Sequence, residues 1–246
     1  HIAVGPGIDG LLGLVCRLTL EPGMPVVTSL GAYPTFNFHV AGYGGALTRV
    51  PYKGDHEDPE ALVSEAKSLA ARLVYLANPD NPMGSHHPAQ VIEDMVANLP
   101  DTALLILDEA YADLAPESSV PVIPAEHPQV IRMRTFSKGY GLAGARVGYA
   151  ITNPDLALAF DKVRDHFGMS RISQAGALAA LRDQDWLRSV KDRTVAARAR
   201  LSAIAVSNGL VPLPSATNFV TIDCGRDGDY ARKLLAELGR LGVFIR

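Results

Sequence analysis

The chain has 246 residues, of which 48% are hydrophobic and 20% are charged, and its formal net charge is −3. This balance is typical of a globular protein with a sizeable core, and it gives no reason to expect nucleic acid or a membrane surface as a partner. Two cysteines, Cys16 and Cys224, are too few for a disulfide framework, so the expected location is a reducing cytoplasm. Both ends fall on strand-like segments, and we therefore expect the chain to be an internal part of a longer protein.

Strand and helix patterns alternate over roughly the first 165 residues. The helix at 58–70 has the clearest start, because Asp58 can cap it and Pro59 can occupy its first position. Residues 36–45 are ambiguous between the two patterns. Strands are predicted at 1–5, 25–30, 46–52, 72–78, 103–109, 129–135 and 145–152, and helices at 11–20, 58–70, 88–99 and 155–167.

The pattern changes after residue 154, where long helical stretches predominate. A helical stretch at 172–209 ends at Asn208-Gly209, a pair typical of a helix C-terminus. It is followed by a predicted strand at 218–223, a helix at 229–242 and a strand at 243–246. We therefore expect two domains, a large one over residues 1–170 and part of a smaller α+β domain over 171–246.

The predicted strands of the large domain are continuous apolar runs without in-out alternation. Such runs favour an α/β fold with a mostly parallel central sheet and helices on both faces. Ligands of these sheets bind beyond the carboxyl ends of the strands. Polar residues cluster at three such ends, at 78–81, 108–111 and 135–138, and the sequence therefore predicts a site there.

Residues 134–149, "RTFSKGYGLAGARVGY", contain a lysine followed by the pattern G-x-G-x-x-G at 139–144. A dinucleotide site would need a helix beginning within those glycines, but only Ala145 and Arg146 separate them from the next predicted strand. A phosphate-binding P-loop is also excluded, because Lys138 precedes the glycines. The remaining functional interpretation is a lysine that reacts covalently.

A lysine amine can form a Schiff base with the aldehyde of pyridoxal 5'-phosphate. That cofactor also needs a carboxylate at its pyridine nitrogen, donors for its ring oxygen, an anion site for its phosphate and an aromatic cover for its ring. The chain offers a candidate for each need. They are Lys138 for the aldehyde, Asp108 for the nitrogen, Asn81 and Tyr111 for the oxygen, Tyr33 for the ring face, and Thr135, Ser137, Arg146 and the glycine-rich turn 5–10 for the phosphate.

Four ordered motifs carry a resemblance that extends from Gly5 to Arg246. They are "NPDNPMG" (78–84), "DEAYADLAP" (108–116), "RTFSKGYGLAGARVGY" (134–149) and "SATNFV" (215–220). In these motifs the chain resembles the fold-type I aminotransferases that depend on pyridoxal phosphate. It is most similar to their histidinol-phosphate aminotransferase branch.

The resemblance implies a role for each candidate. Lys138 would carry the cofactor and then serve as general base and acid, with Asp108 and Tyr33 as the other catalytic residues. Asp108 would pair with the pyridine nitrogen, and Tyr33 would stack on the ring. The cofactor-binding set is completed by Asn81 and Tyr111 at the ring oxygen and by Thr135, Ser137, Arg146 and the amides of Ile8 and Asp9 at the phosphate.

The same resemblance implies partners and leaves alternatives open. It implies an amino donor, with histidinol phosphate as the best guess, an acceptor 2-oxo acid such as 2-oxoglutarate, and a homodimer. A decarboxylase of an amino-acid phosphate and a pyridoxal-phosphate-binding regulatory module stay open. So do core packing for Tyr33 and a surface ion pair for Arg146. No metal is expected, since His86-His87 lies in a polar loop without cysteine or carboxylate ligands at suitable spacing.

Some positions depart from the family pattern. Ile8 stands where the family usually has a small residue, Gly10 where it has Glu, and Met83 where it has Thr. Gly168 stands where the branch commonly has Asn near the substrate, which leaves the amino donor open. The arginine that binds the substrate carboxylate in the family has no counterpart in the chain.

Overall fold

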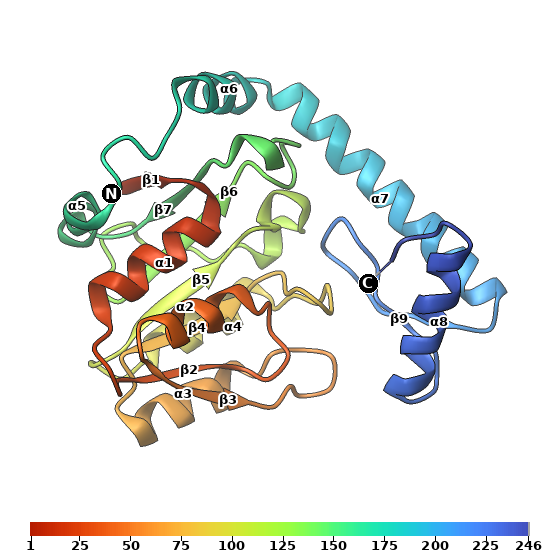
Figure 1. Cartoon of the computed structure of the whole chain (residues 1–246), viewed down its shortest axis with the longest axis horizontal. Helices are drawn as coiled ribbons and strands as arrows, with labels where there is room; N and C mark the ends of the chain where they lie inside the picture. The colour runs from red at the N-terminus through yellow and green to blue at the C-terminus, as the bar shows by residue number, and fades with distance from the viewer. Residues whose placement is uncertain (246) are drawn as a thin grey trace.

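A computed structural model describes residues 1–245 of the chain. Within them, seven strands form one sheet in the order β1-β7-β6-β5-β4-β2-β3 (Figure 1). β7 is antiparallel to both of its neighbours, while the pairs from β6 to β3 are all parallel, which confirms the mostly parallel sheet. The strands are β1 (Ile2–Gly5), β2 (Pro25–Ser29), β3 (Ala46–Val50), β4 (Leu73–Ala77), β5 (Leu104–Asp108), β6 (Val130–Thr135) and β7 (Gly148–Ile151).

Helices cover both faces of this sheet. On one face α1 (Gly7–Thr19), α2 (Thr35–Gly42) and α5 (Pro154–Val163) bury apolar side chains in one core cluster. On the other face α3 (Pro59–Leu69) and α4 (Ala89–Ala97) bury theirs in a second cluster. Three single-turn 3₁₀ helices lie in the connections, at Ala112–Leu114, Glu117–Ser119 and Ala143–Ala145.

The alternation of side chains along β4 and β5 decides which face receives the polar strand ends. Tyr75 and Ile106 lie in the cluster of α1 and α2, whereas Leu76 and Leu107 lie in the cluster of α3 and α4. Successive side chains of a strand point to opposite faces. Asp108 therefore points to the face that α1 and α2 cover.

The helix boundaries agree with the predictions where local signals were strong. The Asp58 side chain caps α3 by accepting a hydrogen bond from the Ala61 N–H at 3.1 Å. The ambiguous segment 36–45 is largely helical, as α2. α1 begins at Gly7, four residues before the predicted start at residue 11, and no side chain caps it.

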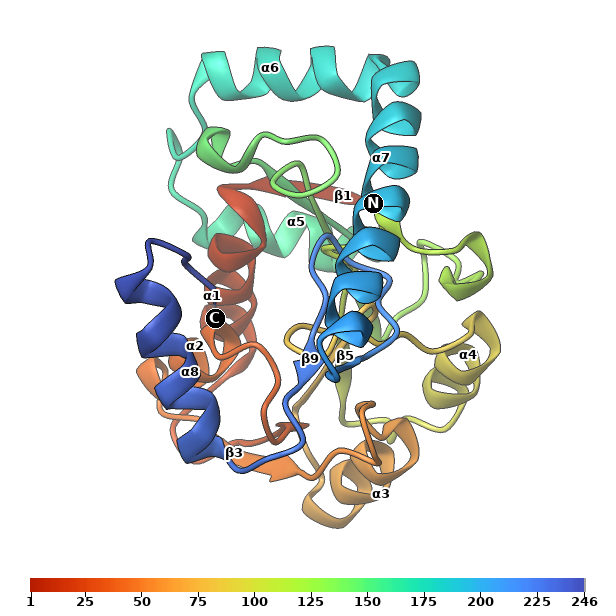
Figure 2. The ribbon, with the colours of Figure 1, turned by 90° about the vertical axis from the view of Figure 1, so that its right-hand side faces the viewer.

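The C-terminal part of the chain is mostly helical. α6 (Arg171–Arg182) and α7 (Gln184–Ser207) lead away from the sheet to β8 (Val211–Pro212), β9 (Ile222–Asp223) and α8 (Gly228–Arg240). Figures 1 and 2 show α7 and α8 on the same side of the sheet, with β9 between the two helices in the view of Figure 2. Asn208 and Gly209, with φ of +72° at Gly209, end α7 as predicted.

Two strand predictions in this part are wrong. Of residues 218–223 only Ile222 and Asp223 form a strand, and two hydroxyl groups bind the backbone of Phe219 in the remainder. Ser215 Oγ donates to the Phe219 carbonyl at 2.6 Å, and Thr217 Oγ1 does so at 3.2 Å. Such side-chain bonds compete with a strand ladder.

The prediction of a strand at 243–246 is also wrong for residues 243–245, and Arg246 lies outside the described residues. The Val243 N–H donates to the Leu238 carbonyl at 2.9 Å and the Gly242 N–H to the Gly239 carbonyl at 3.1 Å. This pair of bonds is a Schellman motif, with Gly242 at φ of +78°. The segment therefore closes the end of α8.

Candidate active site

A cavity of about 210 Å³ lies at the carboxyl ends of β4, β5 and β6, against the first turn of α1. Its wall includes every residue that the sequence predicted for the site: Ile8, Asp9, Tyr33, Asn81, Asp108, Tyr111, Thr135, Ser137, Lys138 and Arg146. The parallel strands bring these residues together from positions up to 138 residues apart, since their carboxyl ends share one edge of the sheet.

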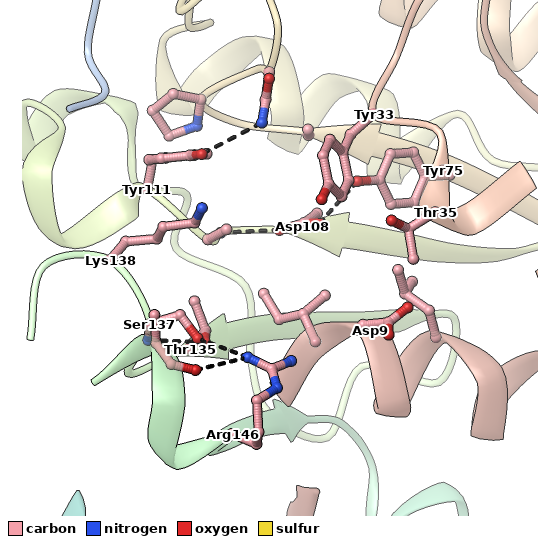
Figure 3. Close-up of a pocket in the computed structure, with 17 residues that line it drawn as sticks. Asp9, Tyr33, Thr35, Tyr75, Asp108, Tyr111, Thr135, Ser137, Lys138 and Arg146 are labelled. Carbon is pink, nitrogen blue, oxygen red and sulfur yellow. Dashed lines mark hydrogen bonds between the residues drawn. The ribbon is translucent and has the colours of Figure 1, made fainter. Parts of the chain in front are cut away.

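Lys138 reaches this cavity from the loop that follows β6. Figure 3 shows its side chain extending toward Tyr111 and Asp108, and Nζ lies 5.0 Å from the centre of the Tyr111 ring. The Gly141 N–H donates to the Lys138 carbonyl at 3.0 Å, so the glycine-rich run turns back tightly. Only the 3₁₀ turn Ala143–Ala145 follows, and the structure thus confirms that no dinucleotide-binding helix begins here.

Asp108 is a buried carboxylate with both oxygens engaged. Oδ1 accepts a hydrogen bond from the Ala110 N–H at 2.9 Å, and Oδ2 accepts one from the Tyr75 hydroxyl at 2.8 Å. Burial raises the pKa of Asp108 above its ordinary value, while these two donors and the Lys138 ammonium lower it in part. A carboxylate in such a place suits the protonated nitrogen of a heterocycle.

Asn81 and Tyr111 form a second polar pair at the cavity wall. Asn81 Nδ2 donates to the Tyr111 hydroxyl at 3.3 Å. The Tyr111 ring is held from behind by the edge of Phe219, with ring centres 5.6 Å apart. Because the Tyr111 oxygen accepts from Asn81, its own O–H can donate to an oxygen of a ligand.

Thr135, Ser137 and Arg146 converge on the opposite side of the cavity (Figure 3). Thr135 Oγ1 donates to Ser137 Oγ at 2.9 Å, and Arg146 Nη1 reaches the same Ser137 oxygen at 3.4 Å. Two carbonyls orient the guanidinium, that of Ala143 at 3.1 Å and that of Pro6 at 3.3 Å. Two hydroxyls and a guanidinium in one corner are donors suited to a phosphate group.

The first turn of α1 completes this corner, which we call the anion cradle. No side chain caps α1, so the N–H groups of its first turn are free to bind an anion, and Ile8 and Asp9 line the cavity. The Asp9 carboxylate itself lies 2.9 Å from His39 Nε2. A Cβ on Gly7 would come within 2.3 Å of Arg146 Nη2, so the cradle is built around a glycine.

The sequence interpretation missed several residues of the cavity. The predicted Tyr33 lines the cavity with 39% of its surface exposed. Among the missed residues, Tyr75 is the most informative, because a tyrosine in the centre of a buried strand needs a hydrogen-bond partner. The missed lining residues are Leu12, Thr35, Tyr75, Ala77, Pro79, Ala110 and Ala143.

Two further buried acids lie beside the cavity and were not predicted. Glu57 accepts hydrogen bonds from Ser29 Oγ at 2.5 Å and the Ala77 N–H at 2.9 Å, and burial raises its pKa to about 8. Asp80 accepts from the Tyr52 hydroxyl and from the Met83 N–H, both at 3.1 Å, and burial raises its pKa to about 6. They hold the strand and loop that carry Ala77 and Asn81.

In residues 1–245, no group of three or more His, Cys, Asp or Glu side chains is placed to hold a metal ion. His87 Nε2 lies 2.9 Å from the Glu57 carbonyl oxygen, and burial lowers the pKa of His87. Among the helices of the same residues, none has the length and apolarity to cross a membrane.

This cavity combines a lysine, a buried carboxylate and an anion cradle at the edge of a mostly parallel sheet. Comparison of the chain with models of known protein families shows which class of protein has this arrangement. The family model described as aminotransferase class I and II matches residues 1–241. The chain belongs to this family.

Individual relatives place the chain more narrowly. It is 35% identical to histidinol-phosphate aminotransferase 2 of Ralstonia nicotianae and 37% identical to histidinol-phosphate aminotransferase 1 of Nitrosococcus oceani, in each case over 100% of the chain. The chain spans 66% of the length of each of these curated relatives.

Solved structures agree with these relatives. The histidinol-phosphate aminotransferase of Sinorhizobium meliloti, crystallised with pyridoxal-5'-phosphate, is 56% identical and superposes with a TM-score of 0.97 over 100% of this chain and 67% of that one. Aspartate aminotransferase of Thermus thermophilus shares the fold with a TM-score of 0.86 at 22% identity, over 99% of this chain and 70% of that one.

Proposed function

We propose that this protein is a pyridoxal-phosphate-dependent aminotransferase that moves an amino group from an amino-acid-like donor to a 2-oxo acid. The observation that carries the proposal is the convergence of the Lys138 amine, the buried Asp108 carboxylate and the anion cradle in one cavity. The histidinol-phosphate aminotransferases to which the chain is similar support it.

The residues present fit the cofactor at each of its polar groups. Lys138 would hold the aldehyde carbon and Asp108 the pyridine nitrogen. Asn81 and Tyr111 would hold the ring oxygen, and Tyr33 would cover a ring face. The phosphate would bind at Thr135, Ser137, Arg146 and the N–H groups of Ile8 and Asp9, where the glycine at position 7 leaves room beside the guanidinium.

When bound, pyridoxal phosphate supplies an aldehyde that carries the amino group and a ring that withdraws electrons from the substrate. Once the substrate amine has displaced it from the aldehyde carbon, Lys138 Nζ would take the proton from the substrate carbon that bears the amino group and deliver it to that aldehyde carbon. Asp108 keeps a negative charge in a buried place, where it favours a positive charge on a neighbouring nitrogen. The Tyr111 hydroxyl donates to an oxygen, and Asn81 orients that hydroxyl.

The donor and acceptor follow from the relatives and stay proposals. We propose histidinol phosphate as the donor, because the relatives carry that name, and 2-oxoglutarate as the acceptor. Since the cofactor stores the amino group between half-reactions, ping-pong kinetics are expected.

The organisation of the full protein is proposed on the same basis. We assign residues 1–170 to the cofactor-binding domain, because the sheet and the residues that line the cavity lie there. Residues 171–246 are assigned to part of a second domain. We further propose a homodimer in a reducing compartment such as the cytoplasm; Cys16 and Cys224 are both free thiols.

Borohydride reduction of the full-length enzyme loaded with pyridoxal phosphate, followed by peptide mass mapping, tests the central claim. The reduced cofactor is expected on Lys138, and its appearance on another lysine or on none contradicts the proposal. A panel of amino donors with 2-oxoglutarate then identifies the substrate. Release of carbon dioxide without amino transfer would indicate a decarboxylase instead.

Substitution of the lysine gives a direct prediction. Lys138→Ala should lower kcat by a factor on the order of 10³ or more, because the group that moves the proton is lost. Steady-state kinetics at saturating cofactor measure this loss. Lys162→Ala is the matched control, since Lys162 is exposed on α5 and its loss should leave kcat unchanged.

A further inference from the structure

Tyr75 lines the cavity and belongs to the core cluster that α1 and α2 cover. Only 1% of its surface is exposed, and its hydroxyl donates to Asp108 Oδ2 at 2.8 Å. Its ring stacks on Phe36 of α2, with ring centres 4.8 Å apart and planes 14° apart. The stacking holds the ring, so the direction of the hydroxyl is determined by the core.

The strand register explains why this tyrosine meets this carboxylate. β4 and β5 pair in parallel with Tyr75 opposite Ile106 and Ala77 opposite Asp108. Tyr75 and Asp108 are therefore diagonal neighbours on one face of the sheet, a separation that an aromatic side chain spans. A shorter side chain at position 75 would leave Oδ2 without this donor.

The surroundings of Asp108 act on its pKa in opposite directions. Burial and the neighbouring Glu109 raise its pKa, whereas the Tyr75 hydroxyl, the Ala110 N–H and the Lys138 ammonium lower it. Asp80 and Glu57 lie close enough to Tyr75 and Asp108 that a negative charge on either acid disfavours ionisation of the Tyr75 hydroxyl. Burial and Asp108 also raise the pKa of Tyr75, so the phenol keeps its proton and stays a donor.

We propose that Tyr75 is a positioning residue that keeps the Asp108 carboxylate ionised and aimed at the cofactor nitrogen. The inference rests on the proposed function, because that function supplies the nitrogen. It gives β4 a role in the chemistry of the site through Tyr75, which itself lines the cavity.

The test removes one oxygen atom from the side chain at position 75. Tyr75→Phe keeps the ring and its stacking on Phe36, and removes only the donor to Oδ2. In full-length enzyme freed of cofactor and labelled with ¹³C at aspartate carboxyls, the Asp108 signal is assigned by its loss in Asp108→Asn. Its titration midpoint should rise by about one pH unit in Tyr75→Phe, a tenfold change in acid dissociation.

A matched control removes a similar hydroxyl elsewhere. Tyr52 donates to Asp80 Oδ1 at 3.1 Å and does not line the cavity. Tyr52→Phe reaches Asp108 only through Asp80, so it should move the Asp108 midpoint by much less than Tyr75→Phe does. In holoenzyme, Tyr75→Phe should lower kcat about tenfold while the KM for the donor changes less than twofold, because a weaker positioning of Asp108 affects the reaction more than donor binding.

A variant in the opposite direction guards against a simple packing effect. 3-Fluorotyrosine at position 75 is a stronger donor of nearly the same shape, and it should lower the Asp108 midpoint. An unchanged midpoint in both Tyr75 variants overturns the inference, even when borohydride places the cofactor on Lys138. Absence of the cofactor from Lys138 overturns the proposed function instead, whatever the Asp108 titration shows.

Discussion

At the scale of single residues, Gly7 is the position in the anion cradle where an added side chain would be least tolerated. Its φ of +80° lies in the left-handed region, and a Cβ there would meet Arg146 Nη2 at 2.3 Å. Two separate costs would therefore follow from any side chain, one in the backbone and one in the position of the guanidinium.

We expect Gly7→Ala to lower the affinity for pyridoxal phosphate at least tenfold, because Arg146 must leave its place beside Ser137. Equilibrium dialysis of the cofactor measures this. Gly23→Ala is the control, since Gly23 has a φ of +86° but nothing within 4 Å of an added Cβ. Backbone strain alone is worth about 1–2 kcal/mol of stability in either variant. Equal loss of affinity in both variants would contradict the role of the Arg146 clash.

Glu57 makes the pH dependence of stability predictable. Its pKa rises from an ordinary 4.5 to about 8 in the folded protein, mainly through burial. Between these two values the folded chain keeps a proton that the unfolded chain releases. The free energy of unfolding therefore falls as the pH rises from about 5 to 8, and the loss is complete above the folded pKa.

Glu57→Gln should remove most of this pH dependence. In Glu57 one oxygen accepts from the Ala77 N–H and the other accepts from Ser29 Oγ. A glutamine keeps an oxygen for the Ala77 N–H and offers an amide to Ser29 Oγ, which can also accept, but a glutamine cannot ionise. The wild type should lose stability on the order of a few kcal/mol more than the variant between pH 5 and 8. Urea unfolding at several pH values measures the difference. Glu60→Gln, at an exposed position of α3, should behave as the wild type, and a matching profile for Glu57→Gln would contradict the assignment.

At the scale of elements, two helices with the same kind of N-terminal cap differ in how much of their surface is buried. α3 buries Leu62, Val63 and Ala66 against the sheet, so its N-terminus is part of the cooperative core. α8 has the same kind of aspartate cap, Asp227 accepting from the Tyr230 N–H at 2.9 Å, but none of its described residues is buried.

Asp58→Ala should therefore lower the global free energy of unfolding by about 1 kcal/mol, the usual value of an N-cap. Asp227→Ala removes an equivalent bond and should leave the global value unchanged, with fraying confined to α8. Urea denaturation of both variants, followed by fluorescence, tests the contrast. A loss in Asp227→Ala as large as in Asp58→Ala would show that α8 unfolds with the core.

At the scale of the whole molecule, a short segment ties the C-terminal part to the site. The Ala216 N–H donates to the Gly84 carbonyl at 2.8 Å, and Thr221 Oγ1 donates to the Pro82 carbonyl at 2.6 Å. The same segment brings Phe219 against Tyr111. The loop that carries Asn81 is thus held from both parts of the chain.

Gly84→Ala should break this connection. Gly84 has a φ of +79°, and a Cβ there would lie 2.7 Å from Ser215 Oγ. We expect the amide hydrogens of Ala216 and Thr217 to exchange at least tenfold faster, because their segment must move away from the loop. Hydrogen exchange with mass spectrometry measures this. Gly54→Ala, at φ of +64° with nothing within 4 Å, should leave that exchange unchanged. Unchanged exchange in Gly84→Ala would show that other contacts hold the segment.

Much of the large domain follows from local signals. Mostly apolar runs of five to eight residues predicted all seven strands of the sheet, and Asp58-Pro59 predicted the start of α3. The location of the candidate site could be predicted from the sequence for a related reason. In a parallel sheet, polar groups that follow successive strands must meet at one edge, so position in the chain predicts proximity in space.

Three features were decided by contacts between distant parts of the chain. The hydroxyl of Tyr75 meets Asp108, 33 residues away, through the register of β4 and β5. The buried Glu57 carboxyl accepts hydrogen bonds from Ser29 and Ala77, which lie 28 and 20 residues from it. The segment at 218–221 is bent by hydroxyls instead of extended, and its hydroxyl Thr221 Oγ1 binds Pro82, 139 residues away.

Strand and helix patterns along the chain thus predict the α/β sheet, and polar strand ends predict the edge of the sheet at which the cavity lies. These depend on side-chain pattern and strand direction, which are local properties. How each polar group of the cavity is held depends on packing: which oxygen of Asp108 meets which donor, and why position 7 must be glycine beside Arg146. Such pairings depend on register and burial, which exist only when segments far apart in the chain pack together.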